Sequence, residues 1–487
     1  MKHVAVIGGG ITGLTATYIL EQVKREHPNE LDYQLFEKSP RLGGMLMTEH
    51  NDGFTIEGGT DSYVTFKPEV NWLIKQLGIE ARRLSPDMNH GGSYVLYDNQ
   101  VYRLPDGVAM LLPFKFTDFA RTPLLSWSGK LRALGDLFIP AKAKGGDESL
   151  ASFINRRLGN EMLEKVVGPL VGGIHSIDPE VMSLQATFPR FLQMEQEHRS
   201  LILAMLQMKR AAKKRNNSQS GSKGNAAGRR SPVLSFINGM GELSNAIEEK
   251  LSPSSIHVNT GVTSIRQQAA GHFTLQLENG ELKDFDAVIM AVGANHSASM
   301  VEEWDQQLSQ LLQTIPFTSS ASVSLGYRTQ DLPNLPYGLG ITIPASEKRH
   351  TTAINFSSLK WDHRVPSEEY TLIRALAGGY SSPELAFQDD ATILRIIQTE
   401  LQEMLGIQVD PVSHRIYRWF HSRPQYTLGH VERVKQIENQ VIQYPGLYMA
   451  GSSYHGAGVS DCVASGIHAT EKLLNQLGIS TEPIMKR

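Results

Sequence analysis

The sequence predicts an α/β protein in which a discontinuous parallel sheet is joined to a mixed β-sheet domain and a helical subdomain. Two apolar runs favour the parallel sheet, because Val4 to Ile7 and Leu447 to Ala450 are each followed by a glycine-bearing turn and a helical pattern. Between these runs the pattern changes: helical spacing dominates residues 101–210, and alternating β patterns dominate residues 315–380. We therefore expect the two ends of the chain to meet in one sheet.

Length and composition are those of a large, ordinary globular chain. The 487 residues are 40% hydrophobic and 20% charged, and at roughly 150 residues per domain they suggest about three structural units. A net charge of −3 gives no global positive field for nucleic acid. The single cysteine, Cys462, excludes an intramolecular disulfide and an all-cysteine metal site, and we expect it to be a packing residue. We expect neither a signal peptide nor a membrane-spanning segment, and therefore a cytoplasmic protein.

The first glycine turn carries Gly8, Gly10 and Gly13 in the G-x-G-x-x-G spacing, between the first strand and a helix expected over Leu14 to Val23. In this pattern the first glycine permits the tight turn, the second lets a pyrophosphate approach the backbone, and the third lets the helix pack on the strand. The helix start offers N–H donors and partial positive charge to the phosphates. The turn therefore predicts a bound dinucleotide.

The segment after the second expected strand, Tyr33 to Phe36, indicates which dinucleotide is bound. Glu37 ends this strand, and its carboxylate would accept hydrogen bonds from the ribose hydroxyls and repel a phosphate there, which disfavours NADP. Two further glycine pairs, Gly43-Gly44 and Gly58-Gly59, favour FAD over NAD because they suggest an extended cofactor that reaches deeper into the protein. The cofactor contacts expected in this part of the chain are Gly8, Gly9, Gly10, Ile11, Thr12, Gly13, Glu37, Lys38, Arg41, Gly43, Gly44, Gly59, Thr60 and Asp61.

The C-terminal turn, Gly451 to Gly458, precedes a helix expected over Val459 to Leu474. The backbone N–H groups of Val459, Ser460 and Asp461 would lie beside the flavin N1 and O2 atoms, where a helix start stabilises the anionic reduced ring. The predicted FAD-binding domain is therefore Rossmann-like and discontinuous.

We expect three parts and one linker along the chain. The FAD-binding domain would comprise 1–66, 232–297 and 441–487, the substrate domain 67–100 and 298–440, and the helical subdomain 101–208. Residues 209–231 are rich in Lys, Arg, Ser, Asn and Gly and are expected to form a flexible basic linker. The linker is interpreted as a solvated loop, with weak contact to a phospholipid surface or an acidic partner as the alternative.

Together these motifs resemble the HemY-type porphyrinogen oxidases of the flavin amine oxidase superfamily. The resemblance covers nearly the whole chain apart from 209–231. It is carried by Ile7 to Leu14, Glu37 to Gly44, Glu57 to Tyr63, Leu170 to Ile174, Leu184 to Pro189, Pro424 to Tyr426 and Gly451 to Gly466. Two segments depart from the family pattern: Gly59-Thr60-Asp61 stands where Gly-Pro-Asp is common, and Gly173-Ile174-His175-Ser176 where Gly-Ile/Val-Tyr-Ala is usual.

The resemblance implies further site residues. By position, Val262 resembles the residue whose backbone meets the adenine, and Trp419 the aromatic residue beside the flavin. Lys67 falls where bacterial members carry a basic residue facing a substrate propionate; an exposed lysine without a ligand is the alternative. Gly173 and Ile174 are expected beside the macrocycle, although Ile174 fits an ordinary core position equally well. His175 is interpreted as a hydrogen-bonded structural histidine rather than a proton shuttle, and no catalytic acid or base is identified.

The activity implied is an FAD-dependent, six-electron oxidation of a porphyrinogen in haem biosynthesis, with molecular oxygen as acceptor and hydrogen peroxide as product. Coproporphyrinogen III is the favoured substrate and protoporphyrinogen IX the alternative. An amine oxidase or desaturase on the same scaffold, and a non-catalytic flavoprotein that only binds porphyrin, remain open because a fold does not determine a substrate. No nucleic-acid partner is expected, and the oligomeric state and protein partners stay open.

Overall fold

A five-stranded parallel sheet unites the two ends of the chain, in the strand order β12-β2-β1-β16-β22. Its strands are β1 (Lys2–Ile7), β2 (Leu31–Phe36), β12 (Ile256–His257), β16 (Ala287–Met290) and β22 (Leu447–Met449). The computed structural model describes residues 1–87, 92–105, 108–109, 112–113, 116–143, 145–218, 231–269, 271–336 and 338–480. The expected meeting of N- and C-terminal strands is confirmed, because β22 pairs with β16, which pairs with β1.

Each face of this sheet is covered by a different layer. Helices α1 (Ile11–Glu26), α2 (Pro68–Leu77), α11 (Gly241–Glu248) and α17 (Val459–Leu477) share one apolar core with it. On the other face, β13 (Val262–Ala269), β14 (His272–Leu277) and β15 (Leu282–Phe285) form a small antiparallel sheet that packs with α12 (Ala294–Val301) and α13 (Gln306–Gln313). A sheet buried on both faces needs strands that are apolar at every position, as Val4 to Ile7 are.

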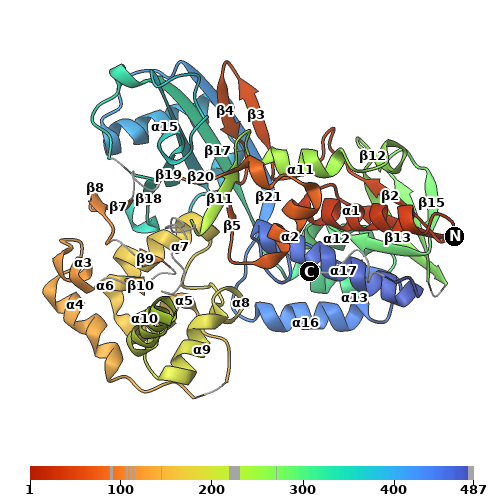
Figure 1. Cartoon of the computed structure of the whole chain (residues 1–487), viewed down its shortest axis with the longest axis horizontal. Helices are drawn as coiled ribbons and strands as arrows, with labels where there is room; N and C mark the ends of the chain where they lie inside the picture. Colours follow the sequence, from red (N-terminus) through yellow and green to blue (C-terminus); the bar gives the residue numbers. More distant parts are fainter. Residues whose placement is uncertain are drawn as a thin grey trace.

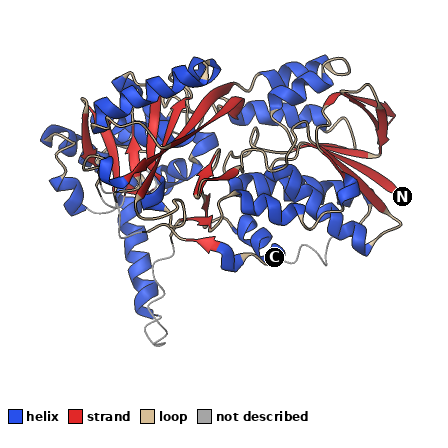
Figure 2. Ribbon diagram, turned by 90° about the horizontal axis from the view of Figure 1, so that it is seen from above, coloured by secondary structure: helices blue, strands red, loops and turns tan. Residues whose placement is uncertain are grey.

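The second large sheet has seven strands in the order β21-β17-β20-β19-β18-β7-β8. Its strands are β7 (Ser93–Tyr97), β8 (Gln100–Arg103), β17 (Phe317–Arg328), β18 (Gly340–Thr342), β19 (Thr351–Phe356), β20 (Tyr370–Gly378) and β21 (Ser413–Pro424). It is mixed, since β18 runs parallel to β7 whereas the other pairs are antiparallel. Figures 1 and 2 show the two large sheets side by side, each with helices packed on it.

Helix α15 (Asp390–Leu405) illustrates how local signals and packing agree in this second sheet. Asp389 caps its N-terminus by accepting a hydrogen bond from the Thr392 N–H at 2.9 Å, and Gly406 ends it in the left-handed conformation. The buried side chains at helical spacing are Ile393, Ile397 and Leu401, which join the core of the seven-stranded sheet.

The helical region has its own core and lies against the second sheet (Figure 1). It contains α3 (Phe116–Arg121), α4 (Trp127–Leu134), α5 (Leu150–Leu158), α6 (Asn160–Met162), a π-helical turn (Leu163–Val167), α7 (Gly168–His175), α8 (Leu184–Thr187), α9 (Pro189–His198) and α10 (Leu201–Ser218). Helix α10 corrects one expectation, because residues 209–218 of the expected linker are helical. The run of Ala, Lys and Arg there consists of strong helix formers, so the helix continues past its apolar part. Residues 219–230 of the expected linker lie outside the described residues.

The remaining elements are short or connect these bodies. They are β3 (Thr48–Asn51), β4 (Phe54–Glu57), β5 (Tyr63–Val64), β6 (Arg83–Leu84), β9 (Val108–Ala109), β10 (Leu112–Pro113), β11 (Val233–Phe236), α14 (Ser357–Lys360) and α16 (His430–Val441). Within the described ranges, no helix has both the length and the apolar character that crossing a membrane requires.

Candidate active site

In the first glycine turn, Gly8 and Gly13 are required by close packing within the protein, whereas Gly10 leaves space for a ligand. Gly8 has φ +104°, and a Cβ there would lie 2.7 Å from the Val292 Cγ1 atom. A Cβ on Gly13 would collide with the carbonyl oxygen of Gly8, which explains the close packing of α1 on the turn. A Cβ on Gly10 would meet no described heavy atom within 4 Å. Gly10 therefore faces open space, as the second glycine of a pyrophosphate turn should.

The start of α1 is also left open. Gly10 occupies the N-cap position with no side chain to cap the helix, and the first turn holds no acidic residue. The backbone N–H groups of Ile11, Thr12 and Gly13 have no hydrogen-bond partner in the described part of the chain. Such a helix start attracts an anion through its free donors and its partial positive charge, which fits the pyrophosphate of FAD.

A second glycine turn lies directly against the first. The Gly43 N–H donates to the Gly9 carbonyl oxygen at 2.8 Å, and Gly10 and Gly43 form an isolated parallel bridge. Arg41 stabilises this turn, because its guanidinium donates to the carbonyl oxygens of Leu42 at 3.0 Å and Gly44 at 2.6 Å. Burial lowers the pKa of Arg41. Two turns that are separate in sequence thus form one backbone cradle.

Glu37 connects the cradle to the next strand. One carboxylate oxygen accepts the Gly9 N–H at 2.6 Å, and the other accepts the N–H and hydroxyl of Ser39 at 2.8 and 2.7 Å. The Glu37 carbonyl accepts the Thr260 N–H at 2.9 Å, which brings the start of β13 and Val262 to this side of the sheet. The buried Val262 side chain belongs to the core on the second face of the sheet. Burial lowers the pKa of His296, and the charges of Lys38 and His421 contribute in the same direction.

The third glycine segment, Gly58 to Asp61, touches the second sheet. A Cβ on Gly59 would collide with the Met45 carbonyl oxygen, and the Gly59 carbonyl accepts a hydrogen bond from Arg374. The Thr60 N–H donates to the Met45 carbonyl oxygen at 3.0 Å, so its backbone is used within the turn. The Trp419 indole N–H donates to the Gly58 carbonyl oxygen at 2.9 Å. The predicted aromatic residue therefore holds this turn.

Asp61 lies at the same junction and forms an ion pair with Lys360 at 2.8 Å. Burial by itself raises the pKa of the Asp61 carboxyl. The charges of Lys360 and Arg374, with hydrogen bonds from Lys360 and Ser62, lower this pKa by more than burial raises it. The net pKa lies well below the usual range, so Asp61 is ionised.

The C-terminal turn packs against the first turn through Thr12. A Cβ on Gly466 in α17 would lie 2.5 Å from the Thr12 carbonyl oxygen, and a Cβ on Gly451 would lie 3.9 Å from the Thr12 hydroxyl. The Gly451 N–H donates to the Ser465 hydroxyl at 2.9 Å, which ties the turn to the helix that follows it. Among the described residues, no hydrogen-bond acceptor is present for the backbone N–H groups at the helix start, those of Val459, Ser460 and Asp461. The C-terminal turn thus lies beside the start of α1, whereas the first turn of α17 differs from that of α1 in carrying an acidic residue, Asp461, whose carboxylate accepts the Gly458 N–H at 3.3 Å.

Tyr426 binds the backbone of the C-terminal turn, a role that the sequence did not indicate. Its hydroxyl donates to the Ser452 carbonyl oxygen at 2.6 Å and accepts the Gly456 N–H at 2.8 Å, so it spans the C-terminal turn. His430 stacks on the Tyr426 ring at 3.9 Å between centroids, and its Nε2 lies 3.1 Å from the Tyr454 carbonyl oxygen. The Pro-Gln-Tyr motif was used only for the family resemblance, and nothing in its spacing indicated this partner.

Lys67 and Asp461 were expected in different roles, facing the substrate and the flavin, and they form an ion pair with each other. The Lys67 side chain is partly exposed just before α2, whereas Asp461 lies in the first turn of α17. The ion pair thus joins the start of α17 to the N-terminal part of the chain.

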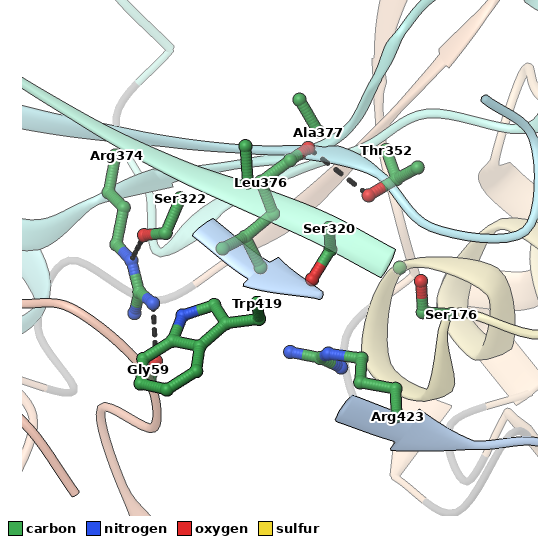
Figure 3. Close-up of a pocket in the computed structure, with 12 residues that line it drawn as sticks. Gly59, Ser176, Ser320, Ser322, Thr352, Arg374, Leu376, Ala377, Trp419 and Arg423 are labelled. Atoms are coloured by element: carbon green, nitrogen blue, oxygen red, sulfur yellow. Dashed lines mark hydrogen bonds between the residues drawn. The ribbon is translucent and has the colours of Figure 1, made fainter. Parts of the chain in front are cut away.

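A small pocket, partly open to solvent, lies between the third glycine segment and the second sheet (Figure 3). Its lining residues are Gly59, Gly173, Ser176, Ser320, Ala321, Ser322, Thr352, Arg374, Leu376, Ala377, Trp419 and Arg423. Gly173 lines this pocket, whereas the Ile174 side chain lies outside the described part of the structure. A Cβ on Gly173 would lie 3.2 Å from Thr342, so this glycine also lets α7 approach the sheet.

Two arginines that the sequence had not singled out give the pocket its charge: Arg374, which is buried, and Arg423, which is partly buried. Arg374 donates to Ser322 at 2.7 Å and to the Gly59 carbonyl oxygen. Burial lowers the pKa of Arg374, whereas Asp61 raises it. Burial and the charge of Arg374 lower the pKa of Arg423 to about 10. Both guanidinium groups therefore remain charged at neutral pH.

His175 ends α7 close to this charge. Burial lowers the pKa of His175 to about 4, with a further contribution from Arg423, so the ring is neutral at neutral pH. Its ring packs edge-on against Phe188 at 5.4 Å between centroids. The part of the chain that the structure describes offers its ring no hydrogen bond, in contrast to the structural histidine that we expected.

Comparison with known proteins identifies the family. A family model described as flavin containing amine oxidoreductase matches residues 11–474. The chain is 35% identical to coproporphyrinogen III oxidase of Bacillus subtilis (strain 168), covering 98% of both chains, and 31% identical to that of Staphylococcus aureus, covering 98% and 100%. Among solved structures, an Exiguobacterium sp. 255-15 protein named as a candidate protoporphyrinogen oxidase has a TM-score of 0.82 at 29% identity, covering 98% and 99%. The chain therefore belongs to the flavin-containing amine oxidoreductases and, within them, to the FAD-dependent porphyrinogen oxidases.

Proposed function

We propose that this protein oxidises coproporphyrinogen III to coproporphyrin III in haem biosynthesis, with molecular oxygen as the acceptor and hydrogen peroxide as the product. The proposal rests on one observation above all: a positively charged pocket adjoins the third glycine segment in a porphyrinogen oxidase fold. A tetra-anionic substrate matches that charge. The relatives named as coproporphyrinogen III oxidases support the same substrate.

The reaction removes six electrons and six hydrogens in three two-electron oxidations, and three molecules of oxygen become three of hydrogen peroxide. When bound, FAD supplies the electron acceptor for each of these oxidations. The chain contributes position and charge. The N–H groups of Ile11, Thr12 and Gly13 would hold the pyrophosphate, and the start of α17 would stabilise negative charge on the reduced ring.

The remaining cofactor contacts are proposed on the same basis. Glu37 would accept from the ribose, the Val262 backbone would meet the adenine, and the turns that contain Gly44 and Thr60 would follow the cofactor toward Trp419. For the substrate we propose Gly173, Ile174 and Lys67; Lys67 would have to exchange its ion pair with Asp461 for a substrate carboxylate. We also propose the division into an FAD-binding domain, a substrate domain and a helical subdomain, and a cytoplasmic location.

The test is a steady-state assay of porphyrin fluorescence with coproporphyrinogen III and protoporphyrinogen IX, together with anaerobic bleaching of the flavin. We expect bleaching by coproporphyrinogen III and a higher kcat/KM for it than for protoporphyrinogen IX. A markedly higher kcat/KM for protoporphyrinogen IX would overturn the choice of substrate. Porphyrin binding without any bleaching would overturn the enzymatic role.

An amine oxidase activity is disfavoured by the same charge. A substrate ammonium group would have to enter a pocket lined by the guanidinium groups of Arg374 and Arg423, where like charges repel each other strongly because the local dielectric is low. Peroxide release with polyamines, and none with porphyrinogens, would contradict this argument.

A further inference from the structure

Arg423 is partly buried and, in contrast to the fully buried Arg157 and Arg364, its guanidinium has no hydrogen-bond or ion-pair partner within the described residues. The Nε atoms of all three arginines are inaccessible to solvent and make no hydrogen bond, so the difference lies in the terminal guanidinium nitrogens, for which Arg423 has no partner within the described residues. Arg157, by contrast, pairs with Asp136 at 2.6 Å. Arg364 donates to the carbonyl oxygens of Ile237 at 2.9 Å and Phe236 at 3.0 Å. A partly buried guanidinium that has lost hydration at Nε and has no anion beside it is a favourable place for an anionic group of a ligand.

The surroundings of Arg423 are those of a ligand pocket. Its side chain extends from β21 into the pocket, toward Ser320 and beside Trp419 (Figure 3). Strand β21 is bulged between Trp419 and Arg423, where His421 has φ +41°, and both residues line the pocket. Hydroxyl groups of Ser176 and Ser320 line the same space and can donate hydrogen bonds to an anion.

Arg374, the other arginine of the pocket, already has hydrogen-bond acceptors and a nearby carboxylate. It donates to Ser322 and Gly59, and Asp61 lies close enough to favour its charge. Among the lining residues of the pocket there is no Asp or Glu that could neutralise Arg423. The pocket therefore carries one positive charge in excess of its local partners, at a position where a bound molecule can reach it.

We propose that Arg423 binds a propionate carboxylate of the porphyrinogen at the inner end of the pocket, with the hydroxyls of Ser176 and Ser320 as auxiliary donors. The proposal rests on the proposed function, because it assigns a substrate group to that same site. A planar guanidinium offers paired N–H donors that match both oxygens of a carboxylate, so Arg423 both orients the macrocycle and selects for acid side chains. Arg374 adds positive charge without direct contact.

The test measures carboxylate recognition without turnover. Holoenzyme is titrated with coproporphyrin III and with its tetramethyl ester, and binding is followed by porphyrin absorbance. The proteins are the wild type, Arg423→Gln, Arg423→Lys and the control Arg418→Gln. Arg418 lies on the same strand but on its opposite face, where it pairs with Asp390 at 2.6 Å.

We expect Arg423→Gln to weaken binding of the acid on the order of tenfold to a hundredfold, which corresponds to one charged hydrogen-bonded contact, and to leave ester binding unchanged. Arg423→Lys should lose less, because it keeps the charge but not the paired donors. Arg418→Gln should match the wild type for both ligands. If Arg423→Gln does not fold, a loss of acid-over-ester preference in Arg423→Lys relative to the wild type supports the proposal.

Equal acid-over-ester preference in all four proteins would overturn the inference. So would a changed flavin reduction potential in Arg423→Gln with unchanged porphyrin binding, because that result would assign the guanidinium to the flavin instead. Failure of the proposed function is separate: it would appear as a wild-type enzyme that does not oxidise coproporphyrinogen III, whatever the effect of Arg423.

Discussion

The cofactor cradle and the pocket beside it are built in opposite ways. The cradle is made of backbone: three glycine turns and two helix starts, in which Glu37 and Arg41 bind neighbouring backbone groups. The pocket is made of side chains from α7, β17, β19, β20 and β21, which come together only in the folded protein. A backbone site is therefore disrupted by added atoms, whereas a side-chain site is disrupted by the loss of charge or hydrogen bonds.

The largest effects are expected for two glycines of the first turn: Gly13, which permits close packing within the protein, and Gly10, which leaves space for the proposed ligand. Gly13→Ala should prevent folding of the turn, because its Cβ would collide with the Gly8 carbonyl oxygen. Gly10→Ala should leave the Tm of the apoprotein unchanged and reduce FAD affinity by at least about tenfold, because the methyl group would occupy the proposed pyrophosphate space. Flavin absorbance and circular dichroism measure both. A fully flavinylated Gly10→Ala protein of wild-type affinity would contradict the cradle.

Tyr426→Phe tests whether a side chain can control a backbone site. Loss of the hydroxyl leaves the Ser452 carbonyl and the Gly456 N–H without their partner, which costs about 1–3 kcal/mol for a buried group. We expect FAD affinity to fall about tenfold. Tyr448→Phe is the matched control, because its hydroxyl contacts the Lys472 carbonyl in an exposed position. Equal FAD affinity in both variants would show that the C-terminal turn needs no such support.

Acidification should weaken the cradle through His430. Burial lowers the pKa of His430 to about 4 in the folded protein, below the ordinary value of about 6.5. Between these two values the unfolded chain binds a proton that the folded chain does not, so the free energy of unfolding falls as the pH falls. His430→Phe should remove up to about 1.4 kcal/mol per pH unit of this dependence. Denaturant unfolding at pH 4.5, 5.5 and 6.5 measures it, and an unchanged pH slope would contradict the prediction.

The smallest effect is expected at Trp419, where the two regions meet. Trp419→Phe keeps an aromatic ring but loses the hydrogen bond to the Gly58 carbonyl oxygen, so we expect a reduction of kcat/KM of about tenfold or less and a small shift of the flavin spectrum. Trp361→Phe is the control, because the indole N–H of this buried residue has no partner within the described ranges. It should lower stability without moving the flavin spectrum. The same spectral shift in both variants would argue against a specific role for Trp419.

Residue patterns predicted the α/β fold, the parallel strands at both chain ends and the glycine turns. They did so because each of these features depends on neighbours within a few residues. Between a strand and a helix, the spacing of Gly8, Gly10 and Gly13 predicts a tight turn with close packing of the helix, and the structure confirms that turn. The end of α10 was predicted wrongly, because the basic composition of residues 209–218 suggested a linker although the same residues favour helix.

Sequence alone determined the elements and the backbone cradle, since hydrophobic period and glycine spacing are local properties of the chain. Only the tertiary structure decided which side chains share the pocket, which arginine is satisfied and which is not, and that Lys67 pairs with Asp461 across the fold. These relations join residues that are far apart in sequence. The physical reason is that charge compensation and hydrogen bonding depend on distances in space, and no periodicity along the chain records those distances.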